Sequence, residues 1–217
     1  MTPTYGISVS DGHGGTSTQP VTFTVVGTND ALVIAADTSG PHTLTEQANA
    51  TGLSTMDTST ATLNFTDLDL NDAHTVSVGA ASAVWSGGST LPAGLLTTLN
   101  AALSSTLNDN AYAGSGSVAL NFAAADGALD FLAAGQTLSV TYNVTVSDTL
   151  GGSSIQPVTF TITGTDDAST LAAAVPDESV HMLSAFSYTV PTGTFQDVDT
   201  PTLTYSATLA DGTALPT

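Results

Sequence analysis

The chain has 217 residues with 19 acidic side chains and no lysine or arginine, so its formal net charge is −19. Without basic side chains it cannot neutralise phosphates, which excludes nucleic-acid binding, polybasic attachment to anionic membranes and any site that needs a lysine or arginine. The absence of cysteine likewise excludes disulfides, thiolate metal sites and a cysteine nucleophile. Metal cations are therefore the natural partners of this chain.

The composition predicts an all-β protein. Hydrophobic residues make up 41% of the chain, enough for a buried core, while only 9% of residues are charged. Threonine and glycine are abundant and glutamate, lysine, arginine and glutamine are scarce, which favours strands and turns over helices. No apolar run reaches the roughly 18 residues of a membrane span, and the first residues lack a basic and apolar leader. We therefore expect no membrane insertion and no signal peptide in this stretch.

One segment of the sequence occurs twice. Residues 4–31 align with residues 141–168 at an offset of 137, with 18 of 28 positions identical. Such a repeat indicates tandem modules. We expect residues 31–168 to form one complete module, residues 1–30 to be the C-terminal hairpin of a truncated preceding module, and residues 169–217 to be the N-terminal part of a truncated following one. The chain would then be a slice of a longer array.

Alternation of apolar and polar residues predicts short antiparallel strands. In chain order these are a hairpin of Tyr5–Val9 against Val21–Val26, strands at 60–65, 74–80 and 117–122, and a hairpin of 142–146 with 158–162. The first hairpin is expected to be either loosely attached or added to a free sheet edge. Apolar residues three and four apart predict one helix near 93–107, and 130–135 looks like a helical turn closed by Gly135. Both helical pieces are expected to cover an edge or end of a sandwich.

Acidic residues recur in a similar arrangement. Each copy of the repeated segment ends in a Gly-Thr-Asn-Asp or Gly-Thr-Asp-Asp linker, and an Asp-x-Asp follows an apolar strand 37 residues after Asp30 and 30 residues after Asp167. The two glutamates, Glu46 and Glu178, lie 16 and 11 residues after their linkers. The linkers and the Asp-x-Asp pairs comprise Asn29, Asp30, Asp67 and Asp69 in the first arrangement and Asp166, Asp167, Asp197 and Asp199 in the second.

Clustered carboxylates repel one another, so without lysine or arginine nearby they must protonate, separate or coordinate a cation. Ca²⁺ fits best, because it takes about six to eight oxygen ligands from carboxylates, amides and backbone carbonyls, whereas Zn²⁺ prefers histidine and cysteine. The alternative is that each Asp or Asn only marks a turn. The recurrence of the whole set favours Ca²⁺ sites.

These residues carry a family resemblance. Residues 31–168 resemble a VCBS-type repeat of bacterial surface proteins through the strings LNFTDLDLNDAHTVSV, ADGALDFLAAGQTLSVTYNVTVSD and QPVTFTITGTDDA. Residues 169–217 resemble the start of a cadherin-like or dystroglycan-type Ig-like domain through FQDVDTPTLTYSATLADGTALP. The resemblance implies tandem extracellular Ig-like β-sandwiches, as in large bacterial RTX-type adhesins that are often exported by type I secretion.

The cadherin-like pattern also implies that the repeated acids bind Ca²⁺ where modules meet. Glu46 resembles its early glutamate, Asp67 and Asp69 its Asp-x-Asp, and Asp148 its hairpin acid. The Asp-Asp linker at 166–167 departs from the Asn-Asp of the family. Strand direction then sorts the ligands. Asn29, Asp30, Asp67, Asp69 and Asp148 are expected at the N-terminal end of the module, and Glu46 with Asp166, Asp167, Asp197 and Asp199 at its C-terminal end.

Other chemistry finds little support in the sequence. The four histidines, His13, His42, His74 and His181, lack a metal-binding spacing and are expected mostly at the surface or in turns. A hydrolase triad is not indicated because no GxSxG motif is present. A glycosidase is not indicated because the few aromatic residues are spread along the strands and form no visible sugar cleft.

We interpret the chain as a non-enzymatic, Ca²⁺-binding structural segment of a secreted or surface-anchored bacterial adhesin. Ca²⁺ would stiffen the junctions between neighbouring modules of the same chain. One alternative is a binding module whose loops around Trp85 contact a host or matrix glycan or protein. Another is an enzyme domain, which a buried pair of carboxylates in an apolar cleft would favour.

Overall fold

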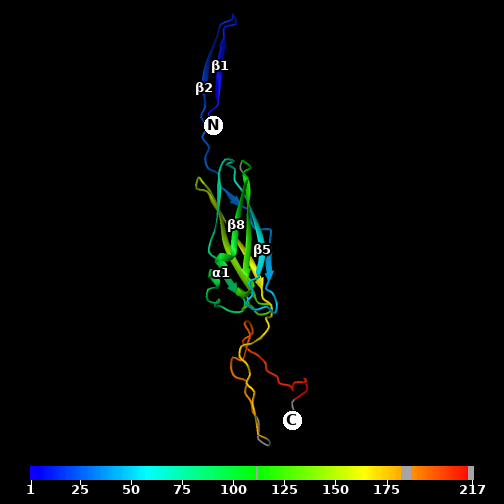
Figure 1. The fold of residues 1–217 in the computed structure, drawn as a ribbon. Helices are drawn as coiled ribbons and strands as arrows, with labels where there is room; N and C mark the ends of the chain where they lie inside the picture. Colours follow the sequence, from blue (N-terminus) through cyan, green and yellow to red (C-terminus); the bar gives the residue numbers. More distant parts are fainter. Residues whose placement is uncertain (111, 182–186, 215–217) are drawn as a thin grey trace.

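The computed structural model describes residues 1–110, 112–181 and 187–214. Residues 182–186 and 215–217 of the expected third unit lie outside these described residues. The described chain consists mainly of strands (Figure 1). In chain order the elements are β1 Thr4–Ser10, β2 Thr16–Thr22, β3 Val33–Ile34, β4 His42–Thr45, β5 Met56–Thr66, β6 His74–Val78, β7 Ser82–Trp85, α1 Leu95–Ala102, β8 Leu103–Asn110, β9 Ser115–Ala125, the 3₁₀ helix η1 Asp126–Ala128, β10 Thr137–Asp148, β11 Ser153–Thr163, β12 Thr170–Leu171 and β13 Phe195–Gln196.

Two sheets form a β-sandwich. One sheet has four strands in the order β3-β5-β9-β8, and the other has five, in the order β4-β11-β10-β6 with β7 also paired to β10. The β4–β11 pair is parallel, and the other pairs are antiparallel. The expected all-β fold with one short helix is therefore confirmed, and its architecture is that of an Ig-like sandwich.

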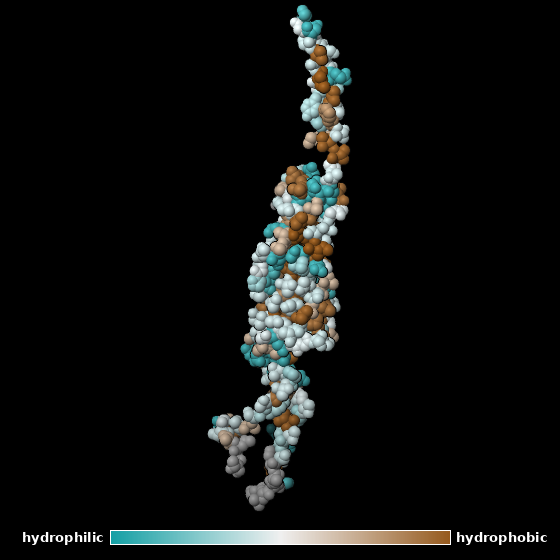
Figure 2. All heavy atoms as spheres, turned by 180° about the vertical axis from the view of Figure 1, so that it is seen from behind, coloured by the Kyte–Doolittle hydropathy of each residue, from teal (hydrophilic) through white to brown (hydrophobic). Residues whose placement is uncertain are grey.

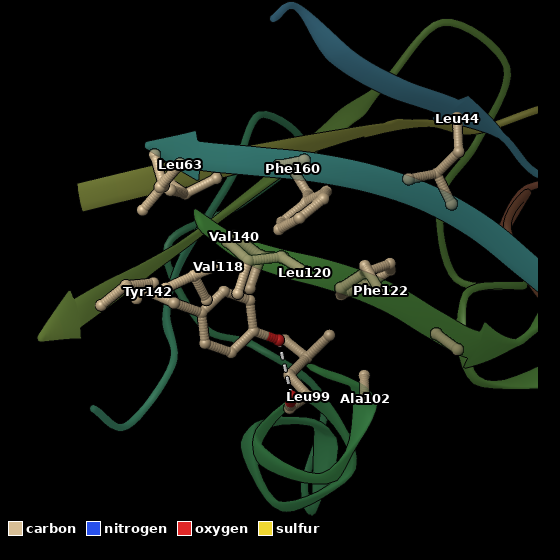
Figure 3. Close-up of a cluster of buried hydrophobic side chains, with 14 of the residues drawn as sticks. Leu44, Leu63, Leu99, Ala102, Val118, Leu120, Phe122, Val140, Tyr142 and Phe160 are labelled. Carbon is tan, nitrogen blue, oxygen red and sulfur yellow. Dashed lines mark hydrogen bonds between the residues drawn. The ribbon is translucent and has the colours of Figure 1, made fainter. Parts of the chain in front are cut away.

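The core lies between the two sheets because their long strands alternate buried and more exposed residues. Phe122 of β9 stacks on Phe160 of β11 with ring centroids 5.1 Å apart. The Tyr142 hydroxyl donates a hydrogen bond of 2.6 Å to the Leu99 carbonyl, which ties α1 to the core (Figure 3). Burial of these large side chains supplies the main stabilisation of a fold without disulfides.

The prediction of a helix near 93–107 is wrong for residues 103–107, which form part of a strand. Helix α1 ends at Ala102, and the chain continues directly as β8, which pairs with β9 from Leu103 opposite Phe122 to Asn110 opposite Ser115. The leucines of 103–110 match a helical period, but pairing with the buried strand β9 decides their conformation. Among the described residues no helix is long and apolar enough to cross a membrane.

The expected helical turn at 130–135 is also displaced. The 3₁₀ helix η1 begins earlier, at Asp126, and residues 129–131 form turns that the Leu129 and Leu132 amides extend. Gly135 does close the segment, with a positive φ of 78°. The shift matters because it brings Asp126 into a buried position at the end of the sandwich.

The β1–β2 hairpin forms a two-stranded sheet of its own beyond one end of the sandwich (Figure 1). It is not added to a sheet edge, and Tyr5–Val9 pairs with Ser17–Val21 rather than with Val21–Val26. The tight turn from Asp11 to Gly15 sets this register. The same register occurs in the second copy of the repeat, where Tyr142 lies opposite Val158.

Beyond the other end of the sandwich the chain repeats the opening of the module. Leu171 pairs with Phe195 and Thr170 with Gln196, as Ile34 pairs with Phe65 and Val33 with Thr66. The chain after Asp167 therefore starts with the same strand pairing as the complete sandwich.

Candidate metal centres

Acidic residues gather at the end of the sandwich where the chain enters from the β1–β2 hairpin. Asp67 and Asp72 follow β5, and Asp148 ends β10; each offers an oxygen, and these atoms lie within 4.8 Å of one another. The linker reaches the same place, since the Asn29 amide donates to Asp148 Oδ2 at 3.2 Å and the Asp30 N–H donates to Asp69 Oδ2 at 2.6 Å. We call this group, Asn29, Asp30, Asp67, Asp69, Asp72 and Asp148, the N-terminal cluster.

Hydrogen bonds within local turns fix the orientation of these carboxylates. Asp67 Oδ1 accepts the Asp69 N–H at 3.0 Å, and Asp148 Oδ1 accepts the N–H groups of Leu150 and Gly152 at 2.8 Å each. A Cβ at Gly152 would collide with the Asp148 carboxylate, so glycine keeps this turn closed. Burial raises the pKa of Asp148, but the hydrogen bonds from Gly152, Asn29 and Leu150 together outweigh it and hold that pKa below its usual range.

A histidine borders the N-terminal cluster, which the sequence did not suggest. The His74 side chain is only 5% exposed, with Nε2 3.2 Å from Asp67 Oδ2 and Nδ1 3.1 Å from Asp109 Oδ1. Burial opposes its protonation, but the hydrogen bonds to Asp67 and Asp109 outweigh it and raise the pKa of His74. His42 is also buried, 2.8 Å from Asp37. The expectation of surface histidines is therefore wrong for these two residues.

A second acidic group occupies the opposite end of the sandwich. Glu46 follows β4, Asp126 and Asp130 follow β9, and Asp167 lies in the linker; all four are buried. Oxygens of Glu46, Asp130 and Asp167 lie within 4.8 Å of one another. Asp57 is buried nearby and interacts with Asp126. We call this group, Glu46, Asp57, Asp126, Asp130 and Asp167, the C-terminal cluster.

Four of these carboxylates are held in the same way. One oxygen of each accepts a backbone N–H: Asp126 from Gln47 at 2.8 Å, Asp167 from Ala50 at 2.9 Å, Asp130 from Gly52 at 2.7 Å and Glu46 from Thr165 at 3.1 Å. Within the described residues the other oxygen of each is buried and has no hydrogen-bond partner. Buried acceptors without partners are costly, and either a proton or a bound cation would satisfy these oxygens.

Burial, and after it mutual repulsion, raises the carboxyl pKa values of the C-terminal cluster. Burial and the charges of Asp167, Asp126 and Asp130 raise the pKa of Glu46 to about 8, against the Thr165 N–H, which lowers it. Burial and the neighbouring Asp126 raise the pKa of Asp57 to about 6. The pKa values of Asp130 and Asp167 are also raised, by burial first and then by nearby carboxylates. A cation at this position would remove the repulsion.

The residues after Asp167 extend this cluster across the junction. Asp167 N–H donates to Asp199 Oδ2 at 3.4 Å and Asp199 N–H to Asp197 Oδ1 at 3.3 Å. Asp30, Asp69 and Asp67 make the same pair of contacts at the other end. The arrangement of linker and Asp-x-Asp is therefore repeated, and the pKa of Asp199 is raised mainly by burial.

The structure sorts the candidate residues as follows. Asp67 and Asp148 come together at one end and Glu46 and Asp167 at the other, while Asn29, Asp30, Asp69 and Asp199 reach these groups through hydrogen bonds. Asp197 contacts Asp199. Asp166 is exposed and takes part through its carbonyl, which accepts the Asn49 N–H at 2.9 Å.

Sequence reasoning missed Asp57, Asp72, Asp126, Asp130 and His74. Asp126 and Asp130 are four residues apart directly after a strand, in a chain without basic residues, and that spacing was an available signal. Asp57 lies near the start of the long strand β5, 69 residues from Asp126, and pairing of β5 with β9, with Asp57 opposite Ala124, brings the two together.

The donors at both ends are oxygens from carboxylates, with an amide at Asn29. This set suits Ca²⁺, which accepts many oxygen ligands in flexible geometry, better than Zn²⁺. The residues present thus fit a bound calcium ion at each end of the sandwich.

Comparisons with known proteins add little to this description. A scan against protein-family models found no match, and no curated protein matches the chain. Among solved structures the chain is similar to the ASH/PapD-like domain of human CEP192 (PapD-like domain 7). The similarity has 13% sequence identity, covers 67% of this chain and 92% of that one, and has a TM-score of 0.31. A likeness at this TM-score carries no statement about function.

Proposed function

We propose that this chain is a non-enzymatic, Ca²⁺-binding structural segment made of tandem β-sandwich modules. Ca²⁺ bound at the module ends would cancel carboxylate repulsion and hold neighbouring modules of the chain in line. The observation that carries this proposal is the C-terminal cluster, where four buried carboxylates each present one oxygen without a protein partner among the described residues.

The repeated junction geometry supports a mechanical role. Asp167 belongs to the C-terminal cluster through its side chain and contacts Asp199 of the following segment through its backbone. A cation held by Glu46, Asp130 and Asp167 would therefore act on both sides of the junction. Removing it would leave like charges facing each other, which favours separation and bending there.

The placement of the carboxylates favours a structural role over catalysis. An enzyme that uses raised carboxyl pKa values needs a substrate cleft beside them. A hollow of about 570 Å³ lies after Asp167, with Val175, Phe195, Leu203 and Tyr205 among its lining residues. Among the described residues no carboxylate lines it. The hollows that carboxylates do line are smaller, about 180 Å³ at Asp72 and Asp109 and about 230 and 260 Å³ at Asp197.

The resemblance to VCBS-type and cadherin-like modules supplies the proposed context, a secreted or surface-anchored bacterial adhesin outside the cell. Extracellular modules bind Ca²⁺ with dissociation constants of roughly 0.1–1 mM. Such sites would fill outside the cell and remain empty in the cytosol. That difference suits export of a loosely folded chain that stiffens after secretion.

The alternative, direct binding of a glycan or protein near Trp85, gains no support from the geometry. Trp85 is half-buried, packs edge-on against Phe131 with centroids 5.2 Å apart, and donates its indole N–H to Gln136 at 2.9 Å. A side chain engaged in this way offers little open aromatic surface to a ligand.

Thermal unfolding tests the proposal. We expect about 5 mM Ca²⁺ to stabilise the chain by about 1–2 kcal/mol per site relative to a chelator, with a much smaller effect of Mg²⁺ at equal ionic strength. Small-angle scattering should show a more uniform, extended particle in Ca²⁺. Equal unfolding curves in Ca²⁺, Mg²⁺ and chelator would overturn the proposal.

The internal repeat offers a matched control. Asp148→Asn and Asp11→Asn change the same position of the repeated turn, because Asp11 accepts the N–H groups of His13 and Gly15 at 2.8 and 2.9 Å. Only Asp148 faces other cluster carboxylates. Asp148→Asn should reduce the stabilisation by Ca²⁺, and Asp11→Asn should leave it unchanged.

A further inference from the structure

We propose that the C-terminal cluster holds two calcium ions, and that the inner one is bound by Asp57 and Asp126 entirely within the sandwich. This inference rests on the proposed function, because it takes Ca²⁺ binding at this end as given, but it assigns a site that the junction itself does not need. The outer ion lies with Glu46, Asp130 and Asp167, the group that includes the linker. The inner ion is held by residues of β5 and η1.

The two aspartates of the inner site, which we call the inner pair, point into the same end of the core. β5 and β9 pair with Asp57 opposite Ala124, and both residues are buried. The pairing continues into η1, where the Asp126 N–H donates to the Thr55 carbonyl at 2.9 Å. Since side chains alternate along a strand, Asp126 follows Ala124 on the inner face and lies diagonal to Asp57. Besides burial, which has the larger effect, the charge of Asp126 raises the pKa of Asp57, as expected of neighbouring carboxylates.

Both carboxylates of the inner pair present a buried oxygen that no protein group satisfies. Asp126 is completely buried and Asp57 is 8% exposed, and within the described residues the Oδ2 atom of each has no hydrogen-bond partner. Figure 2 shows hydrophilic side chains at this end of the sandwich on the face that it displays, but the inner pair is shielded from solvent. A cation between the two carboxylates would satisfy both oxygens.

One ion cannot serve the whole cluster in this arrangement. Oxygens that bind the same Ca²⁺ at about 2.3–2.6 Å lie no more than roughly 5 Å apart. Glu46, Asp130 and Asp167 meet this condition, with oxygens within 4.8 Å of one another. Among the described residues neither Asp57 nor Asp126 joins a group of three metal-ligating side chains at that spacing. The inner pair therefore needs an ion of its own.

Charge balance also favours a second ion. The C-terminal cluster has five buried carboxylates, and the chain has no lysine or arginine to place beside them. One Ca²⁺ would leave about three negative charges uncompensated in a buried site, and two would leave about one. Protons on the inner pair are the alternative source of positive charge, and they are one outcome of the test.

Gln47 connects the inner pair to the loop that follows β4. Its backbone N–H donates to Asp126 Oδ1 at 2.8 Å, which leaves Oδ2 for the ion. Burial and Asp126 raise the pKa of Asp57, while the Gln47 side chain lowers it, so this amide lies beside Asp57. An amide can also present its oxygen to a cation, and such oxygens are ligands of Ca²⁺. Mg²⁺ usually keeps several water ligands, which suits a buried pair less well.

The two ions would have different roles. The outer ion would act on the junction, because Asp167 contacts Asp199 of the following segment. The inner ion would join β5, η1 and the loop after β4, which all belong to one module. It would stay bound when neighbouring modules separate, and it would stabilise the end of the module at which the junction forms.

Backbone N–H groups report separately on the two sites. The N–H of Gln47 donates to Asp126 of the inner pair. The N–H groups that report on the outer ion donate to its three carboxylates, and they belong to Ala50, Gly52 and Thr165. Titration of the full-length chain with Ca²⁺ at neutral pH, followed by ¹⁵N NMR, therefore gives a midpoint for each site.

Asp57→Asn tests the inner site, because it removes the charge of one ligand and keeps the side-chain volume. The Ca²⁺ midpoint of the Gln47 amide should rise at least about tenfold, and those of Ala50 and Gly52 by less than about threefold. Equilibrium dialysis should show one Ca²⁺ fewer per chain than in the unmodified protein. Unfolding in chelator at neutral pH checks the fold, and the variant should lose no stability because a buried like charge is gone.

Asp167→Asn is the reciprocal variant. It should raise the midpoints of Ala50 and Gly52 at least about tenfold and leave that of Gln47 within about threefold. Asp177→Asn, at an exposed position outside the cluster, should change none of the midpoints.

Three results would overturn the inner site. An unchanged Gln47 midpoint in Asp57→Asn would mean that Asp57 is not a ligand. A Gln47 midpoint that rises as much as that of Ala50 in Asp167→Asn would mean that one ion is shared. A Gln47 amide that ignores Ca²⁺ while Ala50 and Gly52 respond would mean that protons neutralise the inner pair. If all of these amides ignore Ca²⁺, the proposed function fails as well, and that result differs from the other three.

Discussion

Phe23 and Phe160 occupy the same position of a repeated hairpin, yet Phe160 is fully buried against Phe122 and Phe23 is 55% exposed. Phe160 lies in β11, and Phe23 directly follows β2, where its N–H donates to the Pro3 carbonyl at 3.0 Å; the two hairpins have the same register. The difference comes entirely from the presence or absence of an opposing sheet. The repeated segment therefore allows the same phenylalanine position to be compared in a core and at a surface.

This pair gives the first prediction. Phe160→Ala should destabilise the chain by about 3–5 kcal/mol, because it removes buried contacts and leaves a cavity between the sheets. Phe23→Ala should change stability by less than about 0.5 kcal/mol, because it removes only an exposed edge-on contact with Tyr5, at 5.8 Å between ring centroids. Denaturant unfolding measures both. A similar loss for the two variants would show that the first hairpin is also packed in solution.

The second prediction concerns pH in the absence of metal. Glu46 keeps its proton up to a pKa of about 8 in the folded chain and only to about 4.5 when unfolded, and Asp57 is raised from 3.8 to about 6. Between these values the folded state binds more protons, so stability falls as pH rises. His74, whose pKa is also raised, acts in the same direction. We expect a loss of at least about 1.4 kcal/mol between pH 5 and pH 8.

Saturating Ca²⁺ should abolish this loss, because the metal replaces the protons on the carboxylates. Unfolding curves at pH 5, 6.5 and 8, each with chelator and with Ca²⁺, test both statements. Stability that rises from pH 5 to pH 8 in chelator would contradict the raised carboxyl pKa values.

The third prediction separates repulsion from ligation at Asp126. Asp126→Asn keeps the oxygen that accepts the Gln47 N–H but removes the charge next to Asp57. In chelator at pH 8 the variant should be more stable by about 1 kcal/mol, since a buried like charge is gone. Its Ca²⁺ affinity should fall about tenfold or more.

Asp177→Asn is the matched control, because Asp177 is exposed and lies outside both clusters. It should alter neither quantity. Isothermal titration with Ca²⁺ and unfolding in chelator provide the two readouts. A loss of stability in chelator for Asp126→Asn would mean that its charge is already compensated within the protein.

The fourth prediction uses His74 as a reporter of the N-terminal cluster. Hydrogen bonds to Asp67 and Asp109 raise the pKa of His74 despite its burial. A calcium ion shared with Asp67 would repel the imidazolium and lower that pKa. Titration followed by NMR should show a lower His74 midpoint in Ca²⁺ than in Mg²⁺ or chelator. An identical midpoint in all three would place the ion away from Asp67.

The sequence was sufficient for much of the fold. Strict alternation in β9, β10 and β11 predicted strands with one buried face, and the structure confirms them. The same approach failed at Leu103 and Leu107, whose helical spacing coincides with strand β8. Spacing reports local preference, and pairing with β9 outweighed it.

By itself, the sequence determined the strand pattern, the repeat and the acidity, because these depend on residue type and order. It also indicated Asp67, Glu46 and Asp167, because their arrangement recurs, and Asp148 through the resemblance to cadherin-like domains. Only the tertiary structure decided that Asp126, Asp130 and Asp57 join Glu46, and that His74 borders Asp67. These residues meet because distant strands end at the same edge of a sandwich, and no local signal encodes which strand ends coincide. The tertiary structure also decided which copy of the repeated hairpin is buried, since its apolar face lies in the core in the second copy and is exposed in the first.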